Sequence, residues 1–138
     1  MTAKEYLQQY RDAVRRAAAS LDHLEELRAM AMRITPNYSG TGGGGQTGDR
    51  IGAEVARIVD AESRVSDELE LLEATEREVI GTIDKITDGT LHTLLYERYI
   101  NGKTFETISV QMNFSYYHIV HRLHPKALKA VKMLLNVT

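Results

Sequence analysis

Apolar side chains in the first quarter of the chain recur at helical spacing. Between Lys4 and about Arg33 they are separated by alternating steps of three and four residues, the spacing of a helix that packs along one stripe. Thr35-Pro36 ends the predicted helix, because the residue before a proline is pushed out of the α region. The stripe comprises Leu7, Tyr10, Val14, Ala17, Leu21 and Leu24, continued by Leu27, Ala31 and Ile34 after a step of three.

A second and longer stripe follows a glycine-rich segment. Residues 35–49, TPNYSGTGGGGQTGD, predict a connection whose last residue, Asp49, caps the next helix. From there the alternation of four and three continues without a break, so a single helix is expected from about Arg50 to Thr87. The stripe positions are Ile51, Val55, Ile58, Glu62, Val65, Leu69, Leu72, Glu76, Val79, Ile83 and Ile86.

These two helices are expected to pack as an antiparallel, coiled-coil-like hairpin. Two helices leave such stripes half covered, and a second copy that completes a four-helix bundle would cover the rest. The carboxylates of Glu62 and Glu76 interrupt the stripe, and burying one without a partner is costly. Each is expected either to meet an arginine (Arg15, Arg16 or Arg28) or to lie where the bundle opens to water. The residues predicted to join the copies are Val55, Ile58, Val65, Leu69, Leu72 and Val79.

The last part of the chain predicts three shorter helices. A helix over residues 90–100 is closed by Asn101-Gly102, a pair suited to the left-handed backbone that ends helices. Thr104 is the expected N-cap of a second helix. A turn over residues 113–115 leads to a third helix over residues 116–135. Two helices joined by a three-residue turn, the second one basic, are the components of a helix-turn-helix.

Asp88-Gly89, a pair typical of a hinge, separates the hairpin from these helices. We therefore predict an all-α protein with two domains. The first, residues 1–87, is a hairpin that oligomerises and contains the glycine-rich connection. The second, residues 90–138, is a helix-turn-helix that binds DNA.

Charge is distributed unevenly between these two parts. The net charge of −2 at pH 7 is an average over the whole chain. Basic residues outnumber acidic ones by four in residues 90–138, whereas acidic residues outnumber basic ones by six in the remainder. A basic end on an acidic body is the asymmetry expected of a protein that meets a polyanion at one end.

Composition excludes several other classes of protein. The chain has no cysteine, which excludes disulfides, thiolate-bound zinc and thiol catalysis. No run of residues approaches the ~20 apolar residues of a membrane span, and the N-terminus lacks the apolar segment of a signal peptide. Neither membrane insertion nor signal-directed export is expected.

The predicted DNA-reading residues lie on the third helix, opposite its apolar side. At ~100° per residue, Val120, Leu123, Ala127, Val131 and Leu134 form the core side, with Tyr116 and Ala130 beside them. Arg122 is the best candidate for a bidentate contact with guanine. The rest of the predicted interface comprises Tyr117, His118 and His121 as hydrogen-bonding groups, Lys103, Lys126 and Lys129 as phosphate ligands, and Thr104. Pro125 is expected to kink the helix or divide it before Lys126.

Several segments together resemble a known group of proteins. The stretch Leu95–Ile108, then Met112–Tyr116 and His121–Leu128, resembles the C-terminal module of small phage-encoded regulators of the ArpU/RinA type, which are late-gene activators, and of an adjoining uncharacterised phage family. That module is similar to region 4 of sigma factors. Met1–Leu7 and Ile34–Gly40 resemble the uncharacterised family, so the resemblance covers nearly the whole chain.

The resemblance implies a transcriptional regulator of phage or prophage genes in the cytoplasm of a bacterial host cell. It would bind duplex DNA as a homodimer or higher oligomer, with RNA polymerase as a further expected partner. One departure is Pro125, which stands where the pattern has glycine or another residue that a helix tolerates. Two alternatives stay open: a small-terminase-like protein that recognises DNA for packaging, and an adaptor that contacts RNA polymerase without binding DNA.

Three other motifs do not favour an enzyme, a cofactor or a metal site. The glycine-rich segment 40–48 contains G-x-G-x-x-G, but no predicted strand precedes it, so a flexible connection is the better interpretation. His118, His121 and His124 are spaced three apart, yet the first and last point about 120° away from each other. The carboxylates between Asp60 and Asp84 fall mostly on outward helix faces.

Overall fold

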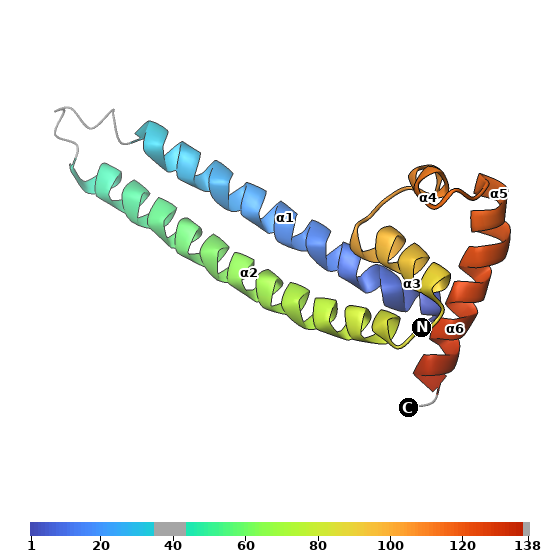
Figure 1. The fold of residues 1–138 in the computed structure, drawn as a ribbon. Helices are drawn as coiled ribbons and strands as arrows, with labels where there is room; N and C mark the ends of the chain where they lie inside the picture. Colours follow the sequence, from blue (N-terminus) through green and yellow to red (C-terminus); the bar gives the residue numbers. More distant parts are fainter. Residues whose placement is uncertain (35–43, 137–138) are drawn as a thin grey trace. The chain divides into compact units, whose positions relative to one another are not determined.

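The computed structural model describes residues 1–34 and 44–136, with side chains for residues 1–33 and 49–136. Every regular element in this part of the chain is helical, which confirms the predicted all-α class (Figure 1). The chain forms two compact units. Unit 1 comprises Met1–Ala13 and Leu72–Thr138, and unit 2 comprises Val14–Leu71. The sequence-based division into an oligomerising hairpin, residues 1–87, and a DNA-binding domain, residues 90–138, stays a prediction.

The two long helices contribute to both units. Helix α1 spans Ala3–Ile34 and begins with a capping box: the Thr2 backbone N–H donates to Glu5 Oε2, and the Glu5 N–H donates to Thr2 Oγ1, each at 3.1 Å. Helix α2 spans Gly44–Asp84. It begins earlier than the predicted Arg50, because an existing helix adds one hydrogen bond per residue and can extend through poor helix formers. The predicted connection over residues 35–43 lies outside the described residues.

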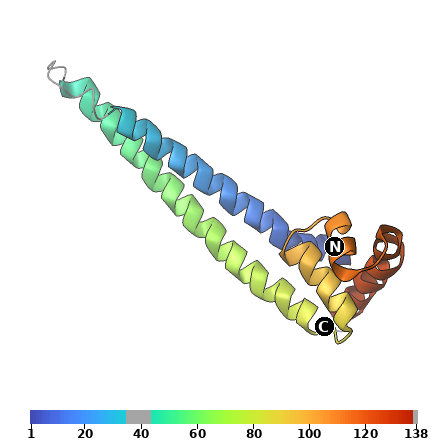
Figure 2. The same ribbon diagram turned by 45° about the horizontal axis from the view of Figure 1, so that its top comes forward.

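Unit 2 is an antiparallel helix pair, as the hairpin prediction requires. Its segments of α1 and α2 lie side by side in both views (Figures 1 and 2). Arg16 pairs with Glu68 at 3.1 Å, and Arg28 pairs with Glu62 at 3.8 Å. The partner's residue number on α2 therefore decreases as the residue number on α1 increases, which shows that the helices are antiparallel. The core of this pair is small: Leu24, Leu27 and Ala61 are buried, and Ile58 and Val65 pack against them.

The buried stripe of α2 differs from the predicted one at three positions. The prediction placed Glu62, Leu69 and Ile83 on the buried stripe. In the structure, the residue just before each of them is buried: Ala61, Glu68 and Thr82. Of the three predicted residues, only Ile83 is buried too. Val55 and Leu69, predicted at the contact between copies, are 53% and 48% exposed in this chain. The reason is geometric. With a stripe this narrow, either of two neighbouring residues of α2 can face the partner helix, and the position of α1 selects which of them is buried.

The two carboxylates that interrupted the predicted stripe are both exposed. Glu62 meets Arg28, one of the three arginines expected for it, and its side chain is 51% exposed. The Glu76 carboxylate lies beside the Tyr10 hydroxyl; burial first, and then this negative charge, raise the pKa of Tyr10. The buried carboxylate of this stripe belongs instead to Glu68, whose side chain is only 10% exposed and hydrogen-bonds Arg16.

Unit 1 joins the ends of the long helices to the C-terminal helices in one core. After α2 come α3 (Gly89–Leu95), the π-helical turn η2 (Tyr96–Ile100), α4 (Phe105–Met112), α5 (Tyr116–His118), the π-helical turn η3 (Ile119–Leu123) and α6 (His124–Asn136). The core contains Tyr6 and Leu7 from α1, Val79 and Ile83 from α2, Leu91, Leu95 and Tyr99 from α3 and η2, and Ala127 and Val131 from α6. This shared core holds α3 and α6 against the long helices.

The predicted hinge at Asp88-Gly89 is the start of a helix. The Asp88 carboxylate accepts hydrogen bonds from the backbone N–H groups of Thr90 and Leu91, at 3.0 and 3.1 Å, and so caps α3. Ile86 before the pair and Leu91 after it belong to the same core cluster. Apolar packing on both sides therefore opposes free bending at this point.

Candidate nucleic-acid interface

Helices α4 and α5 follow each other across a short turn, in the order that the predicted helix-turn-helix has. Thr104 caps α4, as expected, by accepting a hydrogen bond from the Thr107 backbone N–H. Asn113 ends α4 with a left-handed backbone (φ 59°), and Ser115 caps α5 by accepting from the His118 N–H. This left-handed residue turns the chain within three residues. The turn falls on residues 113–115, where the sequence places it.

Three buried aliphatic side chains fix the second helix of this motif against the first. Leu94 from α3, Ile108 from α4 and Ile119 from η3 are each fully buried and form one cluster. Leu123, half-buried, packs against both this cluster and the main core of unit 1. The helix that follows the turn is therefore held along one side, and its other side is open.

A π-helical turn precedes Pro125 in the third helix. Residues 119–123 form η3, and the His124 N–H bonds to the Ile119 carbonyl, five residues back. Proline has no N–H, so the helix cannot make the usual bond from residue 125 to the His121 carbonyl. The helical chain nevertheless continues through Pro125 to Asn136, and α6 starts at His124 rather than at Lys126.

The extra residue in this turn changes which side chains are buried. Ile119 and His124 join the core, although neither was placed on its predicted core side, and Tyr116 is 48% exposed instead of packing beside it. Ala127 and Val131 are fully buried as predicted. A π-helical turn has about one residue more than an α turn, so it rotates the positions before it relative to those after it.

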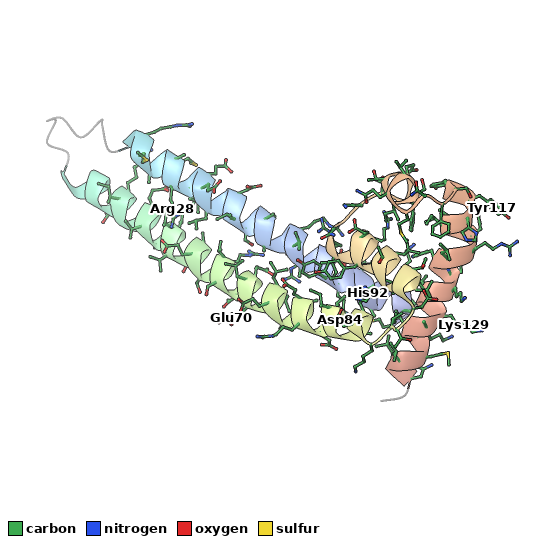
Figure 3. The ribbon with its side chains drawn as sticks, viewed as in Figure 1. Arg28, Glu70, Asp84, His92, Tyr117 and Lys129 are labelled. Atoms are coloured by element: carbon green, nitrogen blue, oxygen red, sulfur yellow. The ribbon has the colours of Figure 1, made fainter. Side chains whose placement is uncertain are left out.

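The open side of the helix carries most of the predicted DNA-reading residues. Tyr117 is 61% exposed, and His121, Arg122, Lys126 and Lys129 are exposed too. In Figure 3, Tyr117 on α5 and Lys129 on α6 both point away from the rest of unit 1. These five residues, which we call the outer face, lie along the continuous helical stretch formed by α5, η3 and α6.

The cations of the outer face have no carboxylate partner within the described residues. No Asp or Glu follows Glu106 in the chain. No ion pair within the described ranges involves Arg122, Lys126 or Lys129. Lys132, also exposed, adds a fourth unpaired cation that the predicted site omitted. Its signal was present in the sequence, since it lies three residues after Lys129 on the same helix.

Two predicted members of the site already make polar contacts within unit 1. The Lys103 ammonium pairs with the Glu97 carboxylate and donates to Gln111 Oε1 at 3.1 Å. The Thr104 hydroxyl serves as the N-cap and donates to Thr107 Oγ1 at 3.0 Å. Their polar groups hold the α4 end in place, and the outer face is made without them.

The three histidines of the third helix, spaced three residues apart, divide between surface and core. The His121 ring packs against the Tyr117 ring at a tilt of 37°, with 4.5 Å between centroids, and the His118 ring centroid lies 5.2 Å from that of Phe114. His124 is 9% exposed; its Nε2 lies 2.7 Å from the Tyr99 hydroxyl. Burial, with lesser effects of Lys4 and Arg98, lowers the His124 pKa to about 4. No group of three metal-ligating side chains occurs among the described residues.

The residues of the predicted interface between copies fall into three sets by burial. Val79 is 1% exposed and lies in the core of unit 1, so it is not available to a second copy, because its contacts within the chain already bury it. Ile58, Val65 and Leu72 are half-buried. Val55 and Leu69 are accessible to a partner.

Comparison with protein-family models, curated proteins and solved structures finds no match to this chain. Among the described residues, no helix has the length and apolar content that crossing a bilayer requires.

Proposed function

We propose that this protein is a transcriptional regulator that binds duplex DNA, as a homodimer, through the helix-turn-helix of unit 1. The observation that carries the proposal is the outer face: Tyr117, His121, Arg122, Lys126 and Lys129 are exposed on the helix that follows the three-residue turn. A helix of this kind fits the major groove, while the helix before it braces it across the backbone.

Partners distinguish the other basic residues of the C-terminal helices from the cations of this surface, which have none within the described residues. Arg98 is held over the Phe105 ring at 4.1 Å and donates to the Lys103 carbonyl, and Lys103 is paired with Glu97. The cations without such partners, Arg122, Lys126, Lys129 and Lys132, all lie beyond the turn. A run of unpaired cations on one helix is the electrostatic footprint of a phosphate-binding surface.

Individual roles follow from side-chain chemistry. Arg122 presents a planar fork of donors that matches the O6 and N7 atoms of guanine. Lys126 and Lys129 lie one and two turns farther along and would bind phosphates, which position the helix without reading sequence. Tyr117 and His121, whose rings pack against each other, would offer hydrogen bonds near the start of the helix.

The test is the salt dependence of binding to a random-sequence duplex, measured by fluorescence anisotropy between about 50 and 200 mM salt, the range over which phosphate contacts weaken strongly. Lys129→Ala is expected to reduce the slope of log K against log salt by about 1. Lys85→Ala is the matched control, because Lys85 is an exposed lysine of unit 1 that lies outside the C-terminal helices. Equal effects of the two substitutions, or binding without salt dependence, would contradict the proposal.

Selection of bound duplexes from a random pool then tests sequence reading. Wild-type protein is expected to recover two half-sites related by two-fold symmetry. Arg122→Ala is expected to relax selection at one guanine per half-site, at a cost of about 1–3 kcal/mol in binding. Recovery of random sequence by the wild-type chain would refute specific recognition, and a ring of many subunits in solution would favour a packaging role.

A further inference from the structure

Aromatic rings surround the turn between α4 and α5. The exposed ones belong to Phe114 in the turn, Tyr116 and Tyr117 on α5, and His121 on η3. Two pairs of rings pack against each other at a spacing of four residues, Phe114 with His118 and Tyr117 with His121. The start of the helix that follows the turn therefore presents apolar ring surface beside its cations.

Tyr117 is the tyrosine of this cluster that belongs to the outer face. Its side chain is 61% exposed and points away from the rest of unit 1 (Figure 3). The His121 ring packs against it, with 4.5 Å between the two centroids, and this contact restricts the rotamers of the Tyr117 side chain. A ring that is already held loses less conformational freedom when a partner covers its remaining surface.

Tyr116, the preceding residue, faces a different direction. Successive residues of a helix point about 100° apart. Tyr116 lies about one turn before Ile119, which is fully buried, whereas Tyr117 lies about one turn before the exposed His121. Tyr116 is 48% exposed, so the two tyrosines share their chemistry and differ mainly in direction. Tyr116 is on the side of the helix that adjoins the core.

An exposed ring on a helix that enters the major groove meets one kind of apolar group. Base edges and phosphates present hydrogen-bond donors and acceptors, and the C5 methyl group of thymine is the apolar feature of the groove. We propose that Tyr117 reads thymine by packing its ring against this methyl group. The inference rests on the proposed function and deepens it, because it assigns a base to Tyr117 and a contact made by the ring rather than by the hydroxyl.

The position of Arg122 limits where this thymine lies. Five residues separate Tyr117 from Arg122 along the helix. At ~1.5 Å per residue this is about 7 Å, the length of about two base-pair steps. Each half-site is therefore expected to contain a thymine within about two base pairs of the guanine assigned to Arg122.

The test removes the methyl group from the DNA and leaves the hydrogen-bonding groups of the base pair unchanged. Each thymine of a duplex recovered by the selection described above is replaced in turn by deoxyuridine, which lacks only that methyl group. Binding is measured by fluorescence anisotropy at one salt concentration. Replacement of the thymine that Tyr117 contacts is expected to weaken binding by wild-type protein about fourfold, the effect of one buried methyl group. Replacement of the other thymines is expected to have no effect.

Three variants assign the effect to the ring of Tyr117. Tyr117→Ala is expected to bind the thymine and deoxyuridine duplexes equally, and Tyr117→Phe to keep the fourfold preference, because it loses only the hydroxyl. Tyr116→Ala is the matched control and is expected to keep the preference as well. A preference that survives Tyr117→Ala, or that is lost in Tyr117→Phe or Tyr116→Ala, overturns the proposal. Circular dichroism of each variant checks that its helices are intact.

The same titrations separate this inference from the proposed function. Sequence-specific, salt-dependent binding with equal affinity for thymine and deoxyuridine at every position refutes thymine reading and leaves the DNA-binding regulator in place. A recovered half-site with no thymine within two base pairs of the guanine has the same meaning. Absence of salt-dependent binding to any duplex refutes both the inference and the proposed function.

Discussion

Lowering the pH is expected to destabilise unit 1 through His124. This side chain is 9% exposed, hydrogen-bonds the Tyr99 hydroxyl and packs edge-on against Phe105, 4.9 Å away between ring centroids. The charged groups that act on it are Lys4 and Arg98, both positive. Burial first and then these charges lower its pKa from 6.5 to about 4. The imidazole is therefore neutral in the folded protein at pH 7.

The sign and size of the effect follow from proton linkage. As the pH falls below 6.5, an unfolded chain binds a proton at His124 before the folded one does, so stability is lost progressively until the pH reaches about 4. A pKa lowered to about 4, at 1.36 kcal/mol per pH unit, corresponds to a loss of about 2 kcal/mol between pH 7 and pH 4.5.

The assay is urea unfolding followed by circular dichroism at a series of pH values, with wild type compared with His124→Gln. The glutamine can still hydrogen-bond Tyr99 but has no proton to gain. The stability difference between the two proteins is expected to change by about 2 kcal/mol between pH 7 and pH 4.5, in favour of the variant at low pH. Because the same carboxylates titrate in both proteins, their contribution to the pH dependence of stability cancels in this difference.

His121→Gln is the matched control, because it makes the same substitution at an exposed histidine outside the buried contacts of His124. A constant difference between wild type and His124→Gln across this range would refute the reasoning. So would an NMR titration in which the His124 ring takes up its proton near pH 6.5.

Two further substitutions test how the helices of unit 1 are terminated. Gly102 has a φ of +69°, and a Cβ placed there would lie 2.6 Å from the Arg11 guanidinium carbon, so Gly102→Ala is expected to destabilise the protein by more than about 1 kcal/mol in urea unfolding; the prediction is wrong if stability is unchanged. Asp88→Ala removes two hydrogen bonds at the start of α3 and is expected to cost about 1 kcal/mol, with Asp88→Asn recovering most of it. An equal loss in both Asp88 variants would contradict the capping role.

Local features of the structure were largely predictable from the sequence. The stop at Gly102, the cap at Thr104 and the turn over residues 113–115 all appear where the residue types indicate. Such features depend on one or two residues and their own backbone, because a left-handed glycine or a capping hydroxyl satisfies its neighbours whatever lies farther away. The exposure of Arg122, Lys126 and Lys129 was predictable for a similar reason, since charged side chains are rarely buried without a partner.

The sequence by itself thus determined the helices, both ends of α4 and the charged side of the last helix, and the tertiary structure decided which positions face the core. On α2, Glu68 rather than Leu69 is buried, because α1 supplies Arg16 as a partner on that side. On the third helix, η3 brings His124 inward, although regular α spacing placed it outside the predicted core side. One residue of rotation moves a helical side chain by about 100°, and only the packing of distant elements sets that rotation.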